Sequence, residues 1–209
     1  MRPGRIVRQR RGGPADDRGC VIRGLQLLLA VLLIGALAGT QARAANPLLA
    51  PPAACPGQNE LDAAPAVQQE VMRCMLEFAR RESGLRTTAA DRDLEWSAQA
   101  KSADILRCDS FSHFACGRDF TYWIRASGYT STRCWRAAEN IAWGTGEAGT
   151  VRSIFHALLD SPPHRENILG SLDRVGVGLR IGNLNGRRNA HVWTQHFGSR
   201  CSERRGEKI

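Results

Sequence analysis

Six cysteines remain in this chain once its N-terminal segment is set aside, and this even set constrains the fold more than any other feature. In an exported protein such a set predicts disulfides, which staple a small domain by linking separate parts of the chain. No Cys-x-x-Cys pair occurs among them, which argues against a zinc knuckle and excludes a thioredoxin-like motif. Fifteen pairings are possible, and nearness in sequence favours Cys108 with Cys116. The six candidates are Cys55, Cys74, Cys108, Cys116, Cys134 and Cys201.

The first 44 residues are predicted to be a secretory signal peptide. An arginine-bearing stretch leads into the apolar run Leu25–Gly39, and the small-residue cleavage pattern Ala42-Arg43-Ala44 follows at once. The run is about fifteen residues long, shorter than the roughly twenty that a membrane-spanning helix needs. We therefore expect cleavage near Ala44, secretion to the extracellular space or the periplasm, and no transmembrane span in the mature chain. An uncleaved membrane anchor is the alternative.

The basic character of the chain belongs largely to that segment. The full sequence has a formal net charge of +9. Residues 1–44 hold eight arginines and two aspartates, so the remainder has 21 basic and 18 acidic side chains and a net charge of +3. A nucleic-acid-binding surface would need clustered Lys and Arg on the folded domain. We therefore expect no nucleic-acid partner, and we expect a monomer.

Composition and periodicity divide the rest of the chain. Residues 45–64 are rich in Pro and Ala and are predicted to be a leader or linker, with the domain at 65–201 and a tail at 202–209. Gly84 is expected to end the first helix, a capping box of Thr88 and Asp91 to begin the second, and Ser161-Pro162-Pro163 to stop the third. The three apolar stripes with helical spacing are Val67, Val71, Met75 and Phe78; Leu94, Ala98 and Ile105; and Val151, Ile154, Phe155, Leu158 and Leu159.

The C-terminal part of the domain has the pattern of an antiparallel hairpin. Val175, Val177, Leu179 and Ile181 alternate with Gly and Arg, residues 191–197 are rich in β-branched and aromatic side chains, and 183–188 supply the turn. Helices followed by such a hairpin predict an α+β or layered α-β-α domain.

Six short phrases occur in order along this domain. They are Phe111-Ser112-His113, Gly128-Tyr129, Ala138–Ala142 (AENIA), Ser161–Leu169 (SPPHRENIL), Val175–Gly178 (VGVG) and Trp193–Gly198 (WTQHFG). Together they resemble the bacterial branch of the CAP superfamily (cysteine-rich secretory proteins, antigen 5 and pathogenesis-related class 1 proteins) over roughly residues 70–201. The resemblance implies a three-layer α-β-α sandwich with a small antiparallel sheet and disulfides, an extracellular site of action and a central cleft.

In that family the cleft typically holds two histidines and two acidic residues, and the resemblance assigns His113, Glu139 and His164 to it. The fourth position departs from the family pattern, which often has a Trp followed by an acid, and Asp160 is the candidate there. The two imidazoles and the Glu139 carboxylate offer the nitrogen and oxygen ligands that suit zinc or a similar divalent metal. The alternative is a hydrogen-bonded polar cluster that holds three loops together.

The other histidines and the tryptophans have simpler interpretations. His156 lies outside the apolar stripe of its helix and is predicted to be solvated. His191 and His196 are five residues apart, hence on opposite faces of a strand, and both are interpreted as structural. The tryptophans either line an apolar groove for a lipid or fill the core, and their exposure decides between the two. They are Trp96, Trp123, Trp135, Trp143 and Trp193.

Three functions are compatible with these features. A secreted binding module for a lipid-like small molecule or an envelope component ranks first, and an extracellular scaffold with a structural His/Glu cluster ranks second. A metal-dependent hydrolase ranks third, because the sequence contains neither a zinc-protease motif nor a Gly-x-Ser-x-Gly elbow and identifies no general base. The sequence therefore favours binding over catalysis.

Overall fold

The computed structural model describes residues 46–132 and 134–200. The chain divides after Ala44, and all described residues belong to the second unit, Ala45–Ile209. The predicted signal peptide, its cleavage site, Cys201 and the predicted tail at 202–209 lie outside the described residues. Across 46–132 and 134–200, no helix is both long enough and apolar enough to cross a membrane.

A four-stranded sheet in the order β1-β3-β4-β2 forms the middle of the domain. Strands β3 and β4 form the predicted antiparallel hairpin, and Asn185 and Gly186 make its turn with positive φ angles of 50° and 72°, as a primed two-residue turn requires. Strand β2 pairs antiparallel with β4 and is an edge strand, whereas the two-residue β1 pairs parallel with β3. The sheet is therefore mixed rather than purely antiparallel. The strands are β1 (Ala89–Ala90), β2 (Trp135–Gly144), β3 (Arg174–Leu184) and β4 (Arg187–Arg200).

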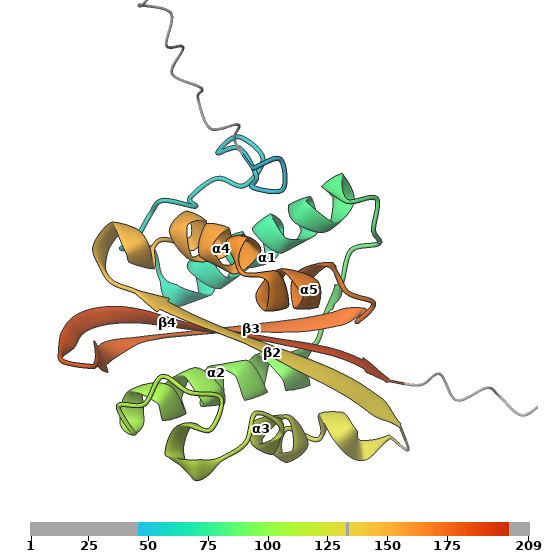
Figure 1. Ribbon diagram of the computed structural model, residues 1–209, viewed down its shortest axis with the longest axis vertical. Coiled ribbons are helices and arrows are strands. Elements are labelled where there is room, and N and C mark those ends of the chain that lie inside the picture. Colours follow the sequence, from blue (N-terminus) through green and yellow to red (C-terminus); the bar gives the residue numbers. More distant parts are fainter. Residues whose placement is uncertain (1–45, 133, 201–209) are drawn as a thin grey trace, which may run out of the picture. The chain divides into compact units, whose positions relative to one another are not determined.

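Helices cover both faces of this sheet, which confirms the α+β class and the α-β-α layering. Figure 1 shows α1, α4 and α5 on one face and α2 and α3 on the other. The helices are α1 (Pro65–Glu82), α2 (Arg92–Arg107), α3 (Thr121–Ala126), α4 (Val151–Asp160) and α5 (Pro162–Leu169). Short 3-10 segments lie at Ala115–Gly117, Tyr129–Ser131 and Gly146–Gly149.

Two details of the predicted helices differ from the structure. Val67 is 50% exposed, because the buried side of α1 is centred on Met72, Met75 and Leu76 instead. Asp91 itself is the N-cap of α2, where its Oδ1 accepts hydrogen bonds from the amides of Asp93 and Leu94.

The proline pair after α4 both ends that helix and begins the next. Helix α4 ends at Asp160, and Pro162 and Pro163 occupy the first turn of α5. Proline is well suited to that turn because its missing N–H would have no intrahelical partner there. The predicted stop is therefore also a start, and it places His164 near the N-terminus of α5.

Glycines let α2 pack directly against β3. A Cβ atom at Gly176 would lie 2.0 Å from the backbone of Leu94, and one at Gly178 would lie 2.3 Å from the backbone of Ala98. No side chain fits at either position. Because Val and Gly alternate in β3, the valines lie on one face of the sheet and the glycines lie on the other, where the α2 backbone packs against them. This close approach brings the polar side of α2 onto β4.

Residues 46–64 belong to the folded unit, which differs from their interpretation as a leader or linker. Ala50 and Cys55 are buried in the apolar cluster under α1 and α4, and Cys55 forms a disulfide with Cys74 of α1. The Arg152 guanidinium on α4 donates to the Ala50 carbonyl at 3.0 Å. Composition alone suggested a linker because the segment has few large apolar side chains. A disulfide and backbone hydrogen bonds hold it in the folded unit instead.

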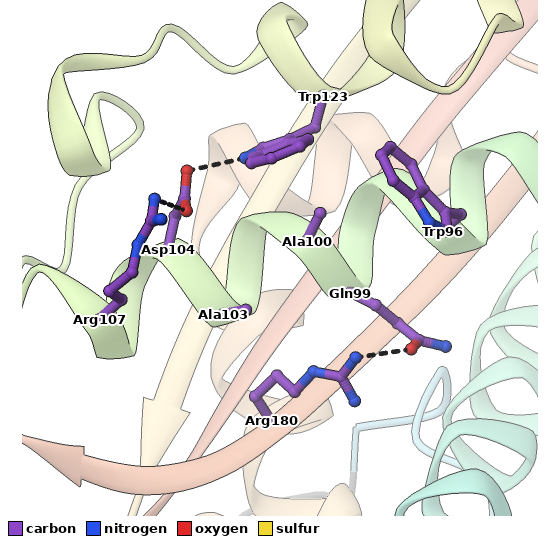
Figure 2. Close-up of a pocket in the computed structure, with 8 residues that line it drawn as sticks. All are labelled: Trp96, Gln99, Ala100, Ala103, Asp104, Arg107, Trp123 and Arg180. Atoms are coloured by element: carbon purple, nitrogen blue, oxygen red, sulfur yellow. Dashed lines mark hydrogen bonds and ion pairs between the residues drawn. The ribbon is translucent and has the colours of Figure 1, made fainter.

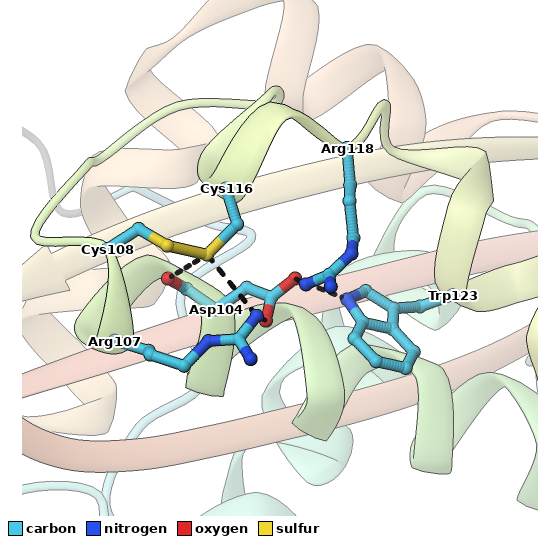
Figure 3. Close-up of a disulfide and its surroundings, with 6 residues drawn as sticks. All are labelled: Asp104, Arg107, Cys108, Cys116, Arg118 and Trp123. Carbon is cyan, nitrogen blue, oxygen red and sulfur yellow. Dashed lines mark hydrogen bonds and ion pairs between the residues drawn. A yellow bond between two sulfur atoms is a disulfide. The ribbon is translucent and has the colours of Figure 1, made fainter.

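The predicted disulfide Cys108–Cys116 is present and closes the loop that carries His113 (Figure 3). Cys134 is disulfide-bonded as well. Stapling of the domain by disulfides is therefore confirmed.

Candidate functional site

Strand pairing brings a carboxylate and an imidazole together on the α2 face of the sheet. Glu139 of β2 is directly opposite His196 of β4, and their side chains are 2% and 0% exposed. The His196 Nε2–H donates to Glu139 Oε2 at 2.8 Å. On its other side, His196 Nδ1 lies 2.7 Å from the Ser97 hydroxyl of α2. Both nitrogens of this buried ring are thus engaged.

His113 reaches the same carboxylate from the disulfide-closed loop. Its Nδ1–H donates to Glu139 Oε1 at 2.6 Å, while its side chain remains 48% exposed. The buried Lys101 ammonium of α2 donates to the His113 carbonyl at 2.6 Å. The neighbouring Phe111 ring packs on Trp143 of β2 with ring centroids 6.4 Å apart. The disulfide, the lysine and the aromatic contact together fix the position of the His113 loop.

The environment keeps Glu139 ionised. Burial favours its neutral form, but hydrogen bonds from His113 and His196, and the charges of His196 and Lys101, outweigh burial and lower the pKa of Glu139 below its ordinary value. Burial in turn lowers the pKa of Lys101, against the attraction of Glu139 and of Asp104 and Asp119. A negative charge at Glu139 is therefore built into the folded domain.

His164 approaches from the other side of edge strand β2. Its Nδ1 lies 2.8 Å from the Ser161 hydroxyl, and its carbonyl accepts a hydrogen bond from the Asn140 amide at 3.1 Å. Burial is the main cause that lowers the pKa of His164, and the nearby His113 lowers it further. Asn140 also bonds Gln195 of β4, so the start of α5 is tied to the sheet.

Asp160, the fourth candidate, makes a contact outside this group. It is the last residue of α4, and its carboxylate is 3.6 Å from Nε2 of His156 one helical turn earlier, with both side chains close to half exposed. The polar side chain that joins His113 at the Glu139 carboxylate is His196. We call His113, Glu139, His164 and His196 the histidine cluster.

The sequence separated the two faces of the strand and interpreted His196 as structural, but it did not place His196 beside Glu139. His191 does face the opposite way, with its Nε2 3.2 Å from the Leu61 carbonyl. The missing information was the register between β2 and β4, which pairs His196 with Glu139 across 57 residues of sequence. The available signal was a histidine within the run of β-branched and aromatic residues at 191–197.

The side chains of the cluster differ in how many of their donor atoms are already hydrogen-bonded. Among the described residues, no group of three or more His, Cys, Asp and Glu side chains is placed to hold an ion. Both oxygens of Glu139 accept hydrogen bonds from imidazole N–H groups. Because His113 donates through Nδ1, its neutral ring has a lone pair at Nε2, the atom that metal-ligating histidines offer when a carboxylate orients them. Across the described residues, neither Nε2 of His113 nor Nε2 of His164 is assigned a hydrogen bond.

The family model described as "Cysteine-rich secretory protein family" (CAP) matches residues 76–197, more than half of the chain. The chain belongs to the cysteine-rich secretory protein (CAP) family. The match spans the histidine cluster, so all four of its residues are part of the CAP domain. This confirms the resemblance seen in the sequence.

Three solved structures are similar to this chain. An outer surface protein from Borrelia burgdorferi is similar with a TM-score of 0.56 and 18% identity, over 66% of this chain and 97% of that one. An extracellular protein containing an SCP domain from Bacillus anthracis has a TM-score of 0.49 and 20% identity, over 65% of this chain and 43% of its own. A cysteine-rich secretory protein from Staphylococcus aureus has a TM-score of 0.49 and 16% identity, over 65% of this chain and 39% of its own. No curated protein matches the chain.

Proposed function

We propose that this CAP-domain protein is a secreted binding module whose histidine cluster holds one divalent, zinc-like metal ion between His113 and His164. In this proposal the ligand atoms are the two Nε2 atoms, and Glu139 orients His113 instead of binding the ion. The observation that carries the proposal is that Nδ1 of each ring already has a partner, Glu139 Oε1 at 2.6 Å and Ser161 Oγ at 2.8 Å. This arrangement of imidazole and outer carboxylate is typical of metal-ligating histidines.

Two protein ligands leave coordination positions open for something else. Zinc usually takes four ligands, so water or the oxygen atoms of a bound molecule would complete the site. We propose that this molecule is a lipid-like small molecule or an envelope component with an oxygen-bearing head group. Secretion is supported by the disulfides, which persist in oxidising compartments, by the signal-like N-terminal sequence, and by the outer surface protein that shares the fold.

Binding is favoured over hydrolysis because the cluster's carboxylate is already engaged. A metal-dependent hydrolase needs a base that can take a proton from water. Glu139 accepts from His113 and His196 with its two oxygens and is almost completely buried. The extracellular scaffold is the second candidate, and it is favoured by the links that the cluster makes to α2, β4 and the disulfide loop.

Metal analysis of the purified, disulfide-bonded chain tests the proposal. After equilibration with zinc and removal of free metal, the protein is expected to retain one zinc per chain. His113→Gln and His164→Gln should each lose it, while His156→Gln, a surface histidine paired with Asp160, should keep it. If the unaltered protein retains no zinc, or if both cluster variants retain it fully, the metal proposal is wrong.

The scaffold alternative makes a different prediction for the same variants. If the cluster is only structural, the unaltered protein binds no metal, while His164→Gln still lowers the melting temperature because Ser161 loses its imidazole partner. Thermal unfolding measured in EDTA and in zinc separates the two cases. A melting temperature that zinc raises in the unaltered protein, but not in the His164→Gln variant, supports the metal site.

A further inference from the structure

An apolar groove lies on the outer side of α2, away from the histidine cluster (Figure 2). Trp96, Ala100, Ala103 and Arg107 follow one another at helical spacing along one side of α2, and Trp123 of α3 stands beside them. Arg180 of β3 lies along the other margin. These residues, with Gln99 and Asp104, line a cavity of about 400 Å³. That volume is in the range of small-molecule sites.

The aromatic wall of the groove is exposed and held in place. Trp96 is 50% exposed, an unusual position for the largest apolar side chain. Its ring meets Trp123 edge to face, with centroids 5.6 Å apart and planes at 73°. The Trp123 indole N–H donates to Asp104 Oδ2 at 2.8 Å. The two alanines leave the floor between the ring and the guanidinium groups shallow and apolar.

The charges at the groove do not cancel. Asp104 is almost buried, and its carboxylate is already paired with Arg107 and, at 2.7 Å, with Arg118, whose guanidinium also lies over the Trp123 ring (Figure 3). Arg180 is exposed and donates to a neutral group, the Gln99 amide oxygen at 3.1 Å. The lining residues carry one carboxylate and two guanidinium groups, and Arg118 adds a third guanidinium beside that carboxylate, so the groove carries a net positive charge.

We propose that this groove, which we call the Trp96 groove, binds a small amphipathic anion with a flat, ring-shaped apolar body and one carboxylate or phosphate group. The body would lie on Trp96 and the alanine floor, where apolar contact and stacking favour a ring. The anionic group would pair with Arg180, whose planar fork matches a carboxylate or a phosphate. The groove is separate from the histidine cluster, so this second site goes beyond the proposed metal-dependent function.

Titration calorimetry with 2-naphthoate, run beside its neutral counterpart 2-naphthalenemethanol, tests this site in the full disulfide-bonded chain. We expect 2-naphthoate to bind one site, and Trp96→Ala to weaken both probes about tenfold or more, since the ring contact that both probes share is removed. Arg180→Gln should weaken 2-naphthoate about fivefold to tenfold and leave the neutral probe unchanged. Decanoate, a flexible anion of similar size, should bind more weakly than 2-naphthoate because the proposed site favours a ring.

Matched controls keep the test specific. Phe114→Ala removes a ring that is 67% exposed outside the groove, and Arg188→Gln removes an exposed guanidinium at the hairpin turn. Neither should change binding. The proposal is overturned if 2-naphthoate does not bind, if the controls weaken it as much as the groove variants, or if decanoate binds as well as the ring. Zinc content should stay the same in Trp96→Ala, so failure here is distinguishable from failure of the metal site.

Discussion

Among the residues that the structure describes, eighteen buried residues form one continuous apolar cluster on the face of the sheet under α1, α4 and α5, whereas the face under α2 has two smaller clusters of six and three. Between those smaller clusters lie buried polar and charged side chains: Ser97, Lys101, Ser102, Glu139, Thr194 and His196. Burying such groups costs free energy unless each finds a partner. The layer of α1, α4 and α5 therefore supplies most of the stability. The α2 layer lowers it somewhat, because it holds buried polar groups in defined positions.

The largest expected effect comes from the apolar layer. Phe155→Ala removes a ring that is 0% exposed in the core of α4 and should cost about 3–5 kcal/mol of the free energy of unfolding. Trp96→Ala, on the outer side of α2, should cost no more than about 1 kcal/mol because the ring is half exposed. Denaturant unfolding of both variants measures the contrast. Equal losses would contradict the division between the layers.

A smaller but still large effect is expected inside the polar layer. Glu139→Gln replaces a two-oxygen acceptor by one oxygen and one NH₂ group, so one of the two imidazole N–H groups loses its acceptor. We expect a loss of about 2 kcal/mol at neutral pH. Glu166→Gln, the same change on an exposed residue of α5, should stay within about 0.5 kcal/mol. A Glu139 variant as stable as the Glu166 control would show that the network is not stabilising.

The Glu139 effect should also depend on pH. Its pKa is lower in the folded chain than the ordinary value of 4.5, so its stabilisation is present above about pH 4.5 and is lost as the pH falls through the folded-state pKa. The stability difference between the unaltered protein and Glu139→Gln should therefore be constant near neutrality and shrink in acid. Denaturant unfolding at several pH values tests this, and a difference that grows in acid would refute it.

His164 should produce a weaker pH dependence in a different range. Because burial and His113 lower its pKa below the ordinary 6.5, the folded state resists its protonation, and stability should fall as the pH drops below about 6.5. Measured in EDTA, this part of the pH profile should be absent in His164→Gln and unchanged in the surface control His156→Gln. An unchanged profile in His164→Gln would mean that another group causes it.

The smallest expected effect concerns Asp160. Its pairing with His156 is solvent-exposed, and such pairs contribute little, so Asp160→Asn should change stability by no more than about 0.5 kcal/mol. It should also leave zinc content unchanged. Loss of zinc in this variant would show that Asp160 contributes to the metal site.

The elements that local patterns encode could be predicted. Helix α4, the β3–β4 hairpin and the Cys108–Cys116 disulfide each depend on residues that are close in sequence, and each is present in the structure. The order of the phrases also identified the family correctly. Apolar spacing placed α1 but put Val67 on its buried side, whereas that side is centred on Met72, Met75 and Leu76 and Val67 is 50% exposed.

What could not be predicted depends on register and long-range anchoring. His196 meets Glu139 only through the β2–β4 ladder, and residues 46–64 join the core through Cys55 and backbone contacts that composition does not reveal. The motif residues His113, Glu139 and His164 were found, but their roles depend on which ring nitrogen is already bonded. The exposure of each tryptophan could not be predicted from the sequence either, since Trp96 lies open to solvent while Trp193 is buried.

The most direct test of the account is a zinc titration, by calorimetry, of three single variants beside the unaltered protein. If Glu139 orients His113 without binding the ion, Glu139→Gln should weaken zinc binding about 10-fold to 100-fold and keep one site per chain. His113→Gln and His164→Gln should remove measurable binding, because each deletes a ligand nitrogen. The account is contradicted if Glu139→Gln abolishes binding as completely as the histidine variants do, or if either histidine variant binds zinc as well as the unaltered protein.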